Sequence, residues 1–227
     1  MPGTQSSFKQ IVAKLECHYG APAPPKITDP LQLIVWENIG YLVEDDRREV
    51  AFEDLRKQIG LKPNEILAAA TEQLIEITRL GGIHPELRAT RLKEIAHIVL
   101  NDFDGDLGSV TQLPLAKAIK ALRKFPSIGE PGAEKILLFS KAFPVLALES
   151  NGLRALLRLG FGQEHKNYAT SYASVRKALR NQVGSDCDYL IKAHQLLRIH
   201  GKGLCKTNSP ACGSCPLARS CSYYETL

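Results

Sequence analysis

The sequence lacks the long apolar segments that mark membrane and exported proteins. No apolar run approaches the about 20 residues that a membrane-spanning helix needs. The first residues, MPGTQSSFKQ, contain no apolar core of the signal-peptide type. We therefore expect an intracellular protein without a membrane partner, cytoplasmic or at the nucleoid if the source is bacterial or archaeal.

Strand signals are equally scarce, since the sequence has no valine or threonine runs of period two, no internal repeat and no low-complexity segment. Hydrophobic residues make up 44% of the 227 residues and charged residues 23%, which is ordinary for a globular protein and excludes extended disorder. The net charge of +5 is compatible with a nucleic-acid partner without requiring one.

Apolar residues recur at helical spacing through most of the chain. Segment 63–79 is predicted to form a single helix that carries Ile66, Leu74 and Ile77 on one face. Further helices are predicted over 90–99, 114–124, 131–142, 150–159, 170–183 and 187–200. The pattern therefore predicts an all-α fold.

Cysteine is concentrated at one end of the sequence. Four of the six cysteines follow the spacing C-x6-C-x2-C-x5-C between Cys205 and Cys221. In a reducing compartment this clustering is typical of a metal site rather than of disulfides. Four thiolates suit either zinc or a [4Fe–4S] cluster, and the spacing alone leaves both open.

This cysteine run, after a helical chain, resembles that of the endonuclease III family of helix-hairpin-helix DNA glycosylases. The resemblance covers roughly residues 8–226. It implies a six-helix barrel with the hairpin over 29–143, a cluster lobe formed by 1–28 and 144–227, and a DNA cleft between the two lobes. It also implies a [4Fe–4S] cluster in loop 205–221 on Cys205, Cys212, Cys215 and Cys221. The basic residues that would then meet DNA phosphates are Lys202, Lys206 and Arg219.

A second stretch, FPSIGEPGA at 125–133, is similar to the family's hairpin pattern L-P-G-h-G-x-K-T-A. The resemblance implies that backbone N–H groups around Ser127, Gly129 and Gly132 bind a DNA phosphate. Pro131 stands where bifunctional members carry a lysine that attacks the sugar as a Schiff-base nucleophile. We therefore expect no efficient lyase activity, with weak lyase activity through Lys135 as an alternative.

Two carboxylates are candidate catalytic groups. Glu149 matches the family's aspartate, which stabilises the positively charged sugar; the alternative is a helix cap. Glu37 follows Trp36 in an apolar helix, where adenine-mismatch glycosylases of the superfamily carry a general acid. The alternative for Glu37 is a solvent-facing side chain, or one paired with Arg47 or Arg48.

The resemblance also assigns DNA contacts in the first lobe. Tyr41 and Leu42 fall where family members fill the space that a flipped base leaves, although core packing is the commoner fate of such residues. Arg88 is a candidate phosphate contact. Together these residues predict a monomeric, monofunctional glycosylase that removes a damaged or mispaired base from double-stranded DNA. The alternative is a non-catalytic binder of distorted DNA.

Overall fold

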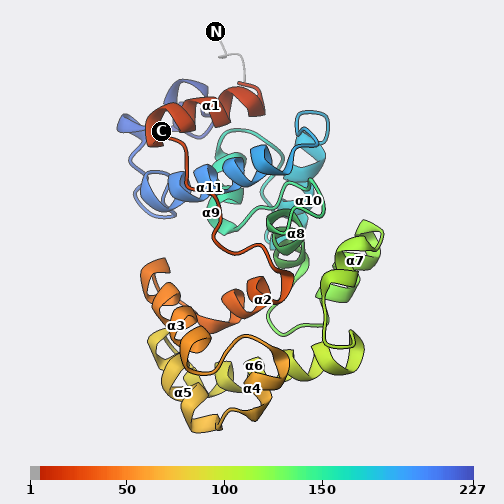
Figure 1. The fold of residues 1–227 in the computed structure, drawn as a ribbon. Coiled ribbons are helices and arrows are strands. Elements are labelled where there is room, and N and C mark those ends of the chain that lie inside the picture. The colour runs from red at the N-terminus through yellow and green to blue at the C-terminus, as the bar shows by residue number, and fades with distance from the viewer. Residues whose placement is uncertain (1–5) are drawn as a thin grey trace. The chain divides into compact units, whose positions relative to one another are not determined.

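The computed structural model describes residues 6–227, in which the regular elements are all helices joined by loops (Figure 1). The all-α prediction is confirmed. Within the described residues the only β-type pairing is an isolated bridge between Tyr41 and Gly82.

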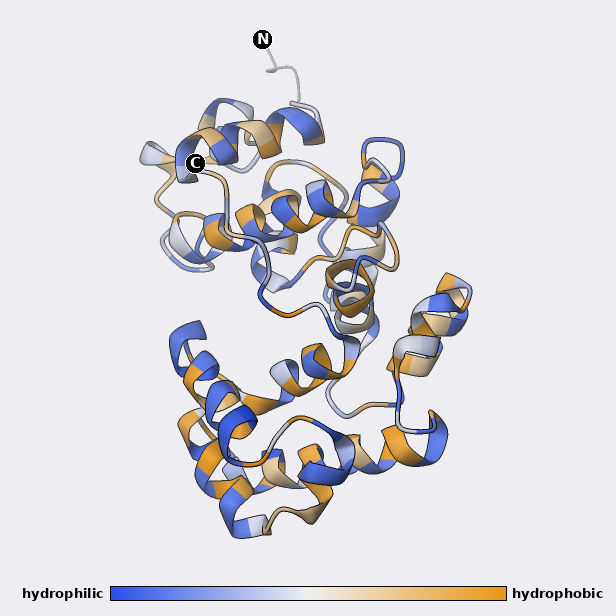
Figure 2. Cartoon of the chain, in the orientation of Figure 1, coloured by the Kyte–Doolittle hydropathy of each residue, from blue (hydrophilic) through white to orange (hydrophobic). Residues whose placement is uncertain are grey.

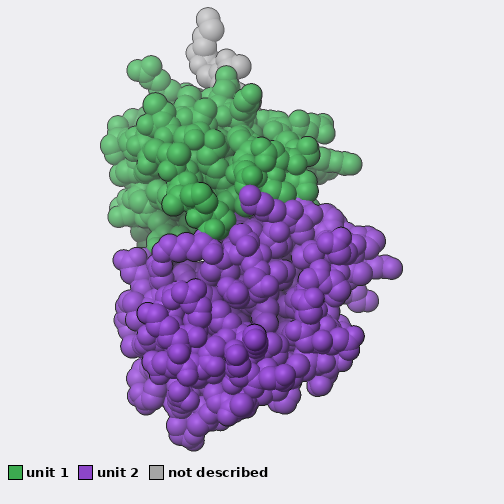
Figure 3. All heavy atoms as spheres, in the orientation of Figure 1, with its two compact units in different colours: residues 1–25, 144–227 green, residues 26–143 purple. Residues whose placement is uncertain are grey.

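The chain divides into two compact units, which Figure 3 shows in different colours. Unit 1 combines residues 1–25 with residues 144–227, and unit 2 comprises residues 26–143. Each unit buries its own apolar side chains, so each is described separately below.

Unit 2 is built around its longest helix, α6 (Pro85–Asp102), which packs against α2, α4 and α5. Leu92, Ile95 and Val99 of α6 are fully buried at these contacts. The other helices of the unit are α2 (Pro30–Ile39), α3 (Asp45–Gln58), α4 (Pro63–Ala68), α5 (Thr71–Leu80), α7 (Leu115–Leu122), α8 (Glu130–Phe139) and the 3₁₀ turn η1 (Gly108–Gln112).

The prediction of one helix over 63–79 is wrong, because the helix breaks after Ala68. Ala69 and Ala70 both adopt extended backbone with ψ near 142°, and α4 and α5 lie on either side. Alanine favours helix, so local propensity does not predict this break. Both short helices pack against α6, and a bend between them allows both to do so.

Unit 1 is built on α11 (Cys187–Gly203), which packs against α9 and α1. Ser7 starts α1 with a reciprocal capping box to Gln10, and Asp186 caps α11. The remaining elements are α1 (Phe8–Tyr19), α9 (Ser150–Arg158), α10 (Tyr168–Leu179) and the 3₁₀ turns η2 (Cys212–Ser214), η3 (Ala218–Ser220) and η4 (Tyr224–Thr226).

Figure 2 shows that hydrophobic and hydrophilic residues are interspersed along the helices, as expected for helices with one buried face. No helix among the described residues is both long and apolar enough to span a membrane.

Candidate functional site

The cysteine loop borders a small pocket of about 20 Å³ in unit 1. Cys205, Cys212, Cys215 and Cys221 all line it, together with His200 from α11. The loop itself has only 3₁₀ turns and buries few apolar side chains. A loop of this kind needs a cross-link to keep one conformation.

The thiols already receive polar contacts from the surrounding helices. Arg158 Nη1 lies 3.5 Å from Cys205 Sγ, and the Leu217 N–H donates to Cys215 Sγ at 3.4 Å. His200 Nε2 lies 3.7 Å from the same Cys215 sulfur. Burial raises the pKa of the Cys215 and Cys221 thiols, and the neighbouring cysteines raise it further.

Four cysteine thiols are a donor set that both zinc and a [4Fe–4S] cluster accept. Within residues 6–227, no three histidine, cysteine, aspartate or glutamate side chains are grouped to hold one metal ion. The four cysteines nevertheless line one pocket, so they are the residues that would hold either group.

Arg158 fastens both ends of this loop to α9. Its guanidinium donates to the backbone oxygens of Lys206 and Thr207, and it lies 4.5 Å from the ring centroid of Tyr223. Its own carbonyl accepts the Tyr223 N–H. Sequence analysis missed Arg158, because nothing in the sequence shows that it reaches residues about fifty positions away.

Glu149 caps the N-terminus of α9. Its Oε1 accepts the Gly152 N–H at 2.5 Å, and its Oε2 accepts the Asn151 side-chain amide at 2.7 Å. The capping alternative therefore describes its local contacts. Burial raises the pKa of Tyr168 to about 12, and the nearby Glu149 charge adds to the rise.

A chain of hydrogen bonds links Glu149 to the cysteine loop. Asn151 donates to Glu149, and Arg154 Nη2 donates to Asn151 Oδ1 at 2.9 Å. The same guanidinium donates to the backbone oxygens of Gly201 and Cys205 at 2.8 and 2.9 Å. The Glu149 carboxylate is thus held by neutral donors that are anchored at a candidate cluster ligand.

Gly201 makes this arrangement sterically possible. A Cβ at this position would lie 2.5 Å from the Asn151 backbone oxygen, closer than any side chain tolerates. The glycine therefore lets α11 approach the start of α9, where Glu149 and Asn151 lie.

The basic residues predicted beside the cluster, Lys202, Lys206 and Arg219, are exposed in unit 1. Their side chains are therefore accessible to a partner.

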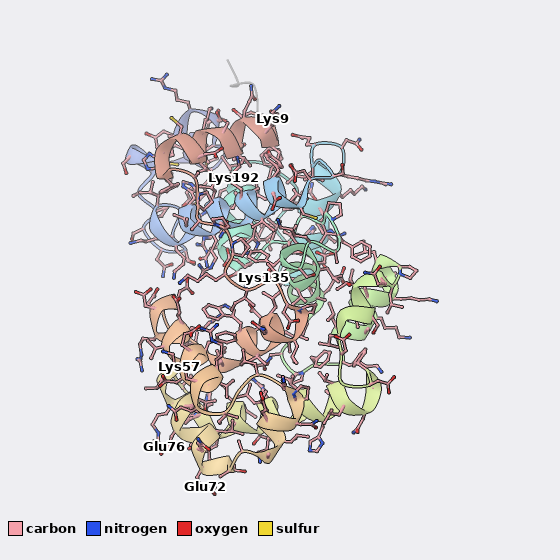
Figure 4. All side chains as sticks on the ribbon, in the orientation of Figure 1. Lys9, Lys57, Glu72, Glu76, Lys135 and Lys192 are labelled. Carbon is pink, nitrogen blue, oxygen red and sulfur yellow. The ribbon has the colours of Figure 1, made fainter. Side chains whose placement is uncertain are left out.

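In unit 2, Glu37 forms an ion pair with Lys135. Glu37 lies on α2 and Lys135 on α8, where Figure 4 labels it, and Lys135 Nζ is 2.6 Å from Glu37 Oε1. The two side chains retain only 25% and 21% of their exposure. Glu37 is therefore paired as one alternative anticipated, but with a lysine 98 residues away in sequence rather than with a nearby arginine.

Hydrogen bonds fix the chain that follows Glu37. Asn38 is buried and donates to the backbone oxygens of Ile34 and Pro126, so it connects α2 to the hairpin. The turn that follows α2 pairs with a second turn, since the Tyr41 N–H donates to the Gly81 carbonyl at 2.9 Å.

The expectation that Arg88 contacts a phosphate is corrected by the structure. Arg88 is 1% exposed, and its guanidinium donates to the backbone oxygens of Ile39 and Gly82 at 2.6 Å each. It joins the two turns from inside the unit, so its donors face carbonyls rather than solvent. A charged side chain is buried here because it satisfies buried carbonyls.

Tyr41 and Leu42 point out of these joined turns. They retain 51% and 76% of their exposure, so core packing does not describe them. Leu42 has φ of 51°, a strained backbone for a leucine. Strain at an exposed apolar residue is typical of a functional position.

Ile83 is a candidate that sequence analysis missed. It sits on the second turn next to Gly82, the partner of Tyr41, and is 47% exposed. The signal in the sequence was an isoleucine between two glycines and a His-Pro pair, which predicts a turn with an apolar tip.

The hairpin joins α7 to α8 through residues 123–129. Ser127 has φ of 63°, the left-handed conformation that the family pattern fills with glycine. Gly129 stands just before α8, which no side chain caps, and the nearest atom to a Cβ there would be 3.8 Å away. Ser127 and Gly129 are exposed, so the helix start is open to an anion. Pro131 is the second residue of α8, and Gly132 lies in the same first turn.

No protein-family profile matches the sequence. Endonuclease III of Rickettsia prowazekii is 30% identical over 113 residues, which are 50% of each protein. Endonuclease III of Thermotoga maritima is 24% identical over 204 residues, which cover 90% of this chain and 88% of that protein. Among solved structures, a trapped covalent endonuclease III–DNA intermediate has a TM-score of 0.74 at 20% identity and covers 97% of this chain and 98% of its own.

Proposed function

We propose that the chain is a member of the endonuclease III-like superfamily and acts as a DNA base-excision repair glycosylase. Its partner is double-stranded DNA that contains a damaged or mispaired base. Such an enzyme acts where the genome lies, which is the cytoplasm or nucleoid if the source is bacterial or archaeal. The observation that carries the proposal is the whole-chain likeness of fold and sequence, joined to two held carboxylates, Glu37 and Glu149.

The DNA contacts come from both units. The open start of α8, with Ser127, Gly129 and Gly132, binds a backbone phosphate without reading sequence. The exposed apolar tips Tyr41, Leu42 and Ile83 fill the space left by the flipped nucleotide. These two roles require a main-chain donor site and an apolar wedge, and unit 2 contains both.

Basic side chains in unit 1 supplement these contacts. Lys202, Lys206 and Arg219 are exposed on and beside the cysteine loop, and they meet further phosphates.

The reaction is hydrolysis of the N-glycosidic bond. The bond between C1′ and the base breaks, and the base leaves with the bonding electrons. A water oxygen adds to C1′ and gives up a proton, and the base gains one. Glu149 stabilises the positive charge that develops on the sugar. Glu37 assists the proton transfers of the same step.

Cys205, Cys212, Cys215 and Cys221 hold a [4Fe–4S] cluster in this proposal. When bound, the cluster supplies a cross-link that fixes the loop. The support is the four-thiol cavity and the contacts from Arg158 and Leu217. Iron analysis and the absorption spectrum of purified protein distinguish iron from zinc.

Lyase activity is expected to be absent or weak, since Pro131 has no amine and Lys135 is engaged with Glu37. End-labelled duplexes test this, each with one uracil, oxidised pyrimidine, alkylated purine, mismatched adenine or abasic site. Each reaction is divided, and half receives hot alkali. Cleavage only after alkali supports a monofunctional glycosylase and names its substrate. Cleavage without alkali contradicts the monofunctional assignment.

A binder without catalysis remains an outcome of the same assay. In that case no duplex is cut, while distorted or abasic DNA is still retained in a gel shift. Glu149→Gln and Glu37→Gln complete the test, because a true glycosylase loses excision in one or both variants.

A further inference from the structure

We propose that Lys135 is a positioning residue that holds Glu37 as a carboxylate, so that Glu37 accepts a proton in the reaction instead of donating one. This inference rests on the proposed function. In this inference Lys135 is not a nucleophile, and Glu37 is not a general acid.

The geometry of the pair is specific. Lys135 Nζ lies 2.6 Å from Glu37 Oε1, and it also lies 5.8 Å from the ring centroid of Phe139, one turn further along α8. The ammonium therefore lies near a carboxylate and an aromatic ring, both of which favour a cation. Both side chains are about three-quarters buried, so solvent screens the pair less than it would at the surface.

The supports of the pair are rigid. α2 is tied to the hairpin by Asn38, the neighbour of Glu37, which donates to the Pro126 carbonyl. α8 begins at Glu130, three residues after Ser127, and Lys135 lies between the buried residues Glu134 and Ile136. The distance between Nζ and Oε1 is thus set by two anchored helices rather than by mobile loops.

Charged groups on the other helices that pack against α2 make contacts of their own. Arg48 on α3 lies over the Trp36 ring at 5.8 Å, and Arg88 on α6 donates to the Ile39 carbonyl. On α8, Glu134 precedes Lys135 and is fully buried. Lys135 places its ammonium 2.6 Å from the Glu37 carboxylate.

An ammonium at hydrogen-bond distance stabilises the charged form of a carboxyl group. Held in that form, Glu37 has a lone pair for the proton of an attacking water and a negative charge for the sugar cation, but no proton for a departing base. The same ion pair engages the Lys135 nitrogen, so its attack on C1′ is disfavoured.

The test measures single-turnover excision against pH, on the substrate that the duplex panel identifies. Lys135→Gln is the main variant, because an amide still donates to Glu37 while the positive charge is removed. Lys135→Arg keeps the charge. Lys57→Met, on the exposed end of α3, is the matched control for loss of a lysine elsewhere in unit 2.

Without the ammonium, Glu37 becomes easier to protonate, and the protonated form is inactive in this proposal. Lys135→Gln is therefore expected to lose activity on the acid side of neutrality and regain it as pH rises. A positioned acid–base group contributes about 10²–10⁴-fold, so a loss of at least about tenfold is expected at the acid end. Lys135→Arg and Lys57→Met are expected to keep the wild-type profile.

Two results overturn the inference. A loss by the same factor at every pH means that Lys135 only supports the structure. Recovery of Lys135→Gln as pH falls means that Glu37 acts as an acid. Thermal unfolding of each variant verifies that the fold is retained, and Lys135→Met repeats the test if Lys135→Gln does not fold.

Borohydride trapping on abasic DNA supplies an independent readout. No covalent adduct is expected, and an adduct that disappears in Lys135→Gln would show that Lys135 is a nucleophile after all. Failure of the proposed function looks different, because wild-type protein then excises no base from any duplex in the panel.

Discussion

The two candidate carboxylates of this protein are held in different ways. Glu149, in unit 1, accepts hydrogen bonds from a backbone N–H and from the Asn151 amide, and this network continues through Arg154 to the Cys205 carbonyl. Glu37, in unit 2, forms an ion pair with the ammonium of Lys135. Neutral donors orient one carboxylate, and a cation fixes the charge of the other.

This difference separates two functions that a glycosylase needs from its acids. A carboxylate oriented by neutral dipoles keeps its negative charge available to a cation such as the developing sugar. A carboxylate paired with an ammonium keeps a defined protonation state. The predictions below disturb one side of this comparison at a time.

The largest effect is expected from Cys215→Ser, which removes one candidate cluster ligand. Iron content should fall close to zero and the cysteine loop should lose its conformation, because metal binding and folding are linked. The Arg154 network would then lose its anchor, and a displacement of about 1 Å at Glu149 costs about 100-fold in excision rate.

Cys17→Ser is the matched control, since Cys17 is exposed on α1 and stands apart from the cavity. Iron content and excision should both stay at the wild-type value. Full iron retention in Cys215→Ser would contradict the ligand assignment.

Arg88→Met affects unit 2, because it leaves the Ile39 and Gly82 carbonyls without the hydrogen-bond donors of Arg88. Hydrogen bonds from a charged group are worth about 1.5–3 kcal/mol each, so the free energy of unfolding should fall by about 3 kcal/mol. Chemical denaturation measures this change.

The control is Arg79→Met, an exposed arginine on α5 whose loss should change stability by about 0.5 kcal/mol or less. If Arg88→Met were as stable as this control and bound DNA more weakly, Arg88 would be a phosphate contact rather than a buried link between the two turns.

Arg154→Gln cuts the chain between Glu149 and the loop while leaving all four cysteines in place. Excision should fall by about tenfold, since small displacements of a catalytic group are costly. The pH profile should not shift, because Glu37 and Lys135 are untouched. Arg180→Gln, at the exposed end of α10, should leave the rate unchanged.

The smallest effect on stability is expected from Leu42→Asn. Asparagine tolerates positive φ, so the free energy of unfolding should stay the same or rise slightly. Excision should still fall by severalfold, since the apolar wedge is lost. Equal excision in Leu42→Asn and wild type would remove Leu42 from the DNA-contact set.

The sequence predicts the helical class because apolar residues recur every three to four positions in nearly every segment. It does not predict the break after Ala68, since three consecutive alanines favour helix and only packing on α6 explains the bend. Helical propensity is local, whereas this break depends on a third helix.

The candidate site likewise contains some features that the sequence predicts and others that it does not. The cysteine spacing and the hairpin pattern are visible as local motifs. The pairing of Glu37 with Lys135 spans 98 residues, and no local pattern predicts it. Arg88 was misjudged because charge alone suggests exposure, whereas the structure gives the guanidinium two buried carbonyls to satisfy.

The central claim is that this protein hydrolyses the bond between a base and its sugar in duplex DNA. Mass spectrometry of the complete reaction, with the substrate chosen from the duplex panel, tests it most directly. The account predicts one free base released for each DNA strand that loses the mass of that base, with the strand backbone uncut. Bound DNA of unchanged mass, with no free base at any pH, would contradict the account and identify a protein that recognises damage without removing it.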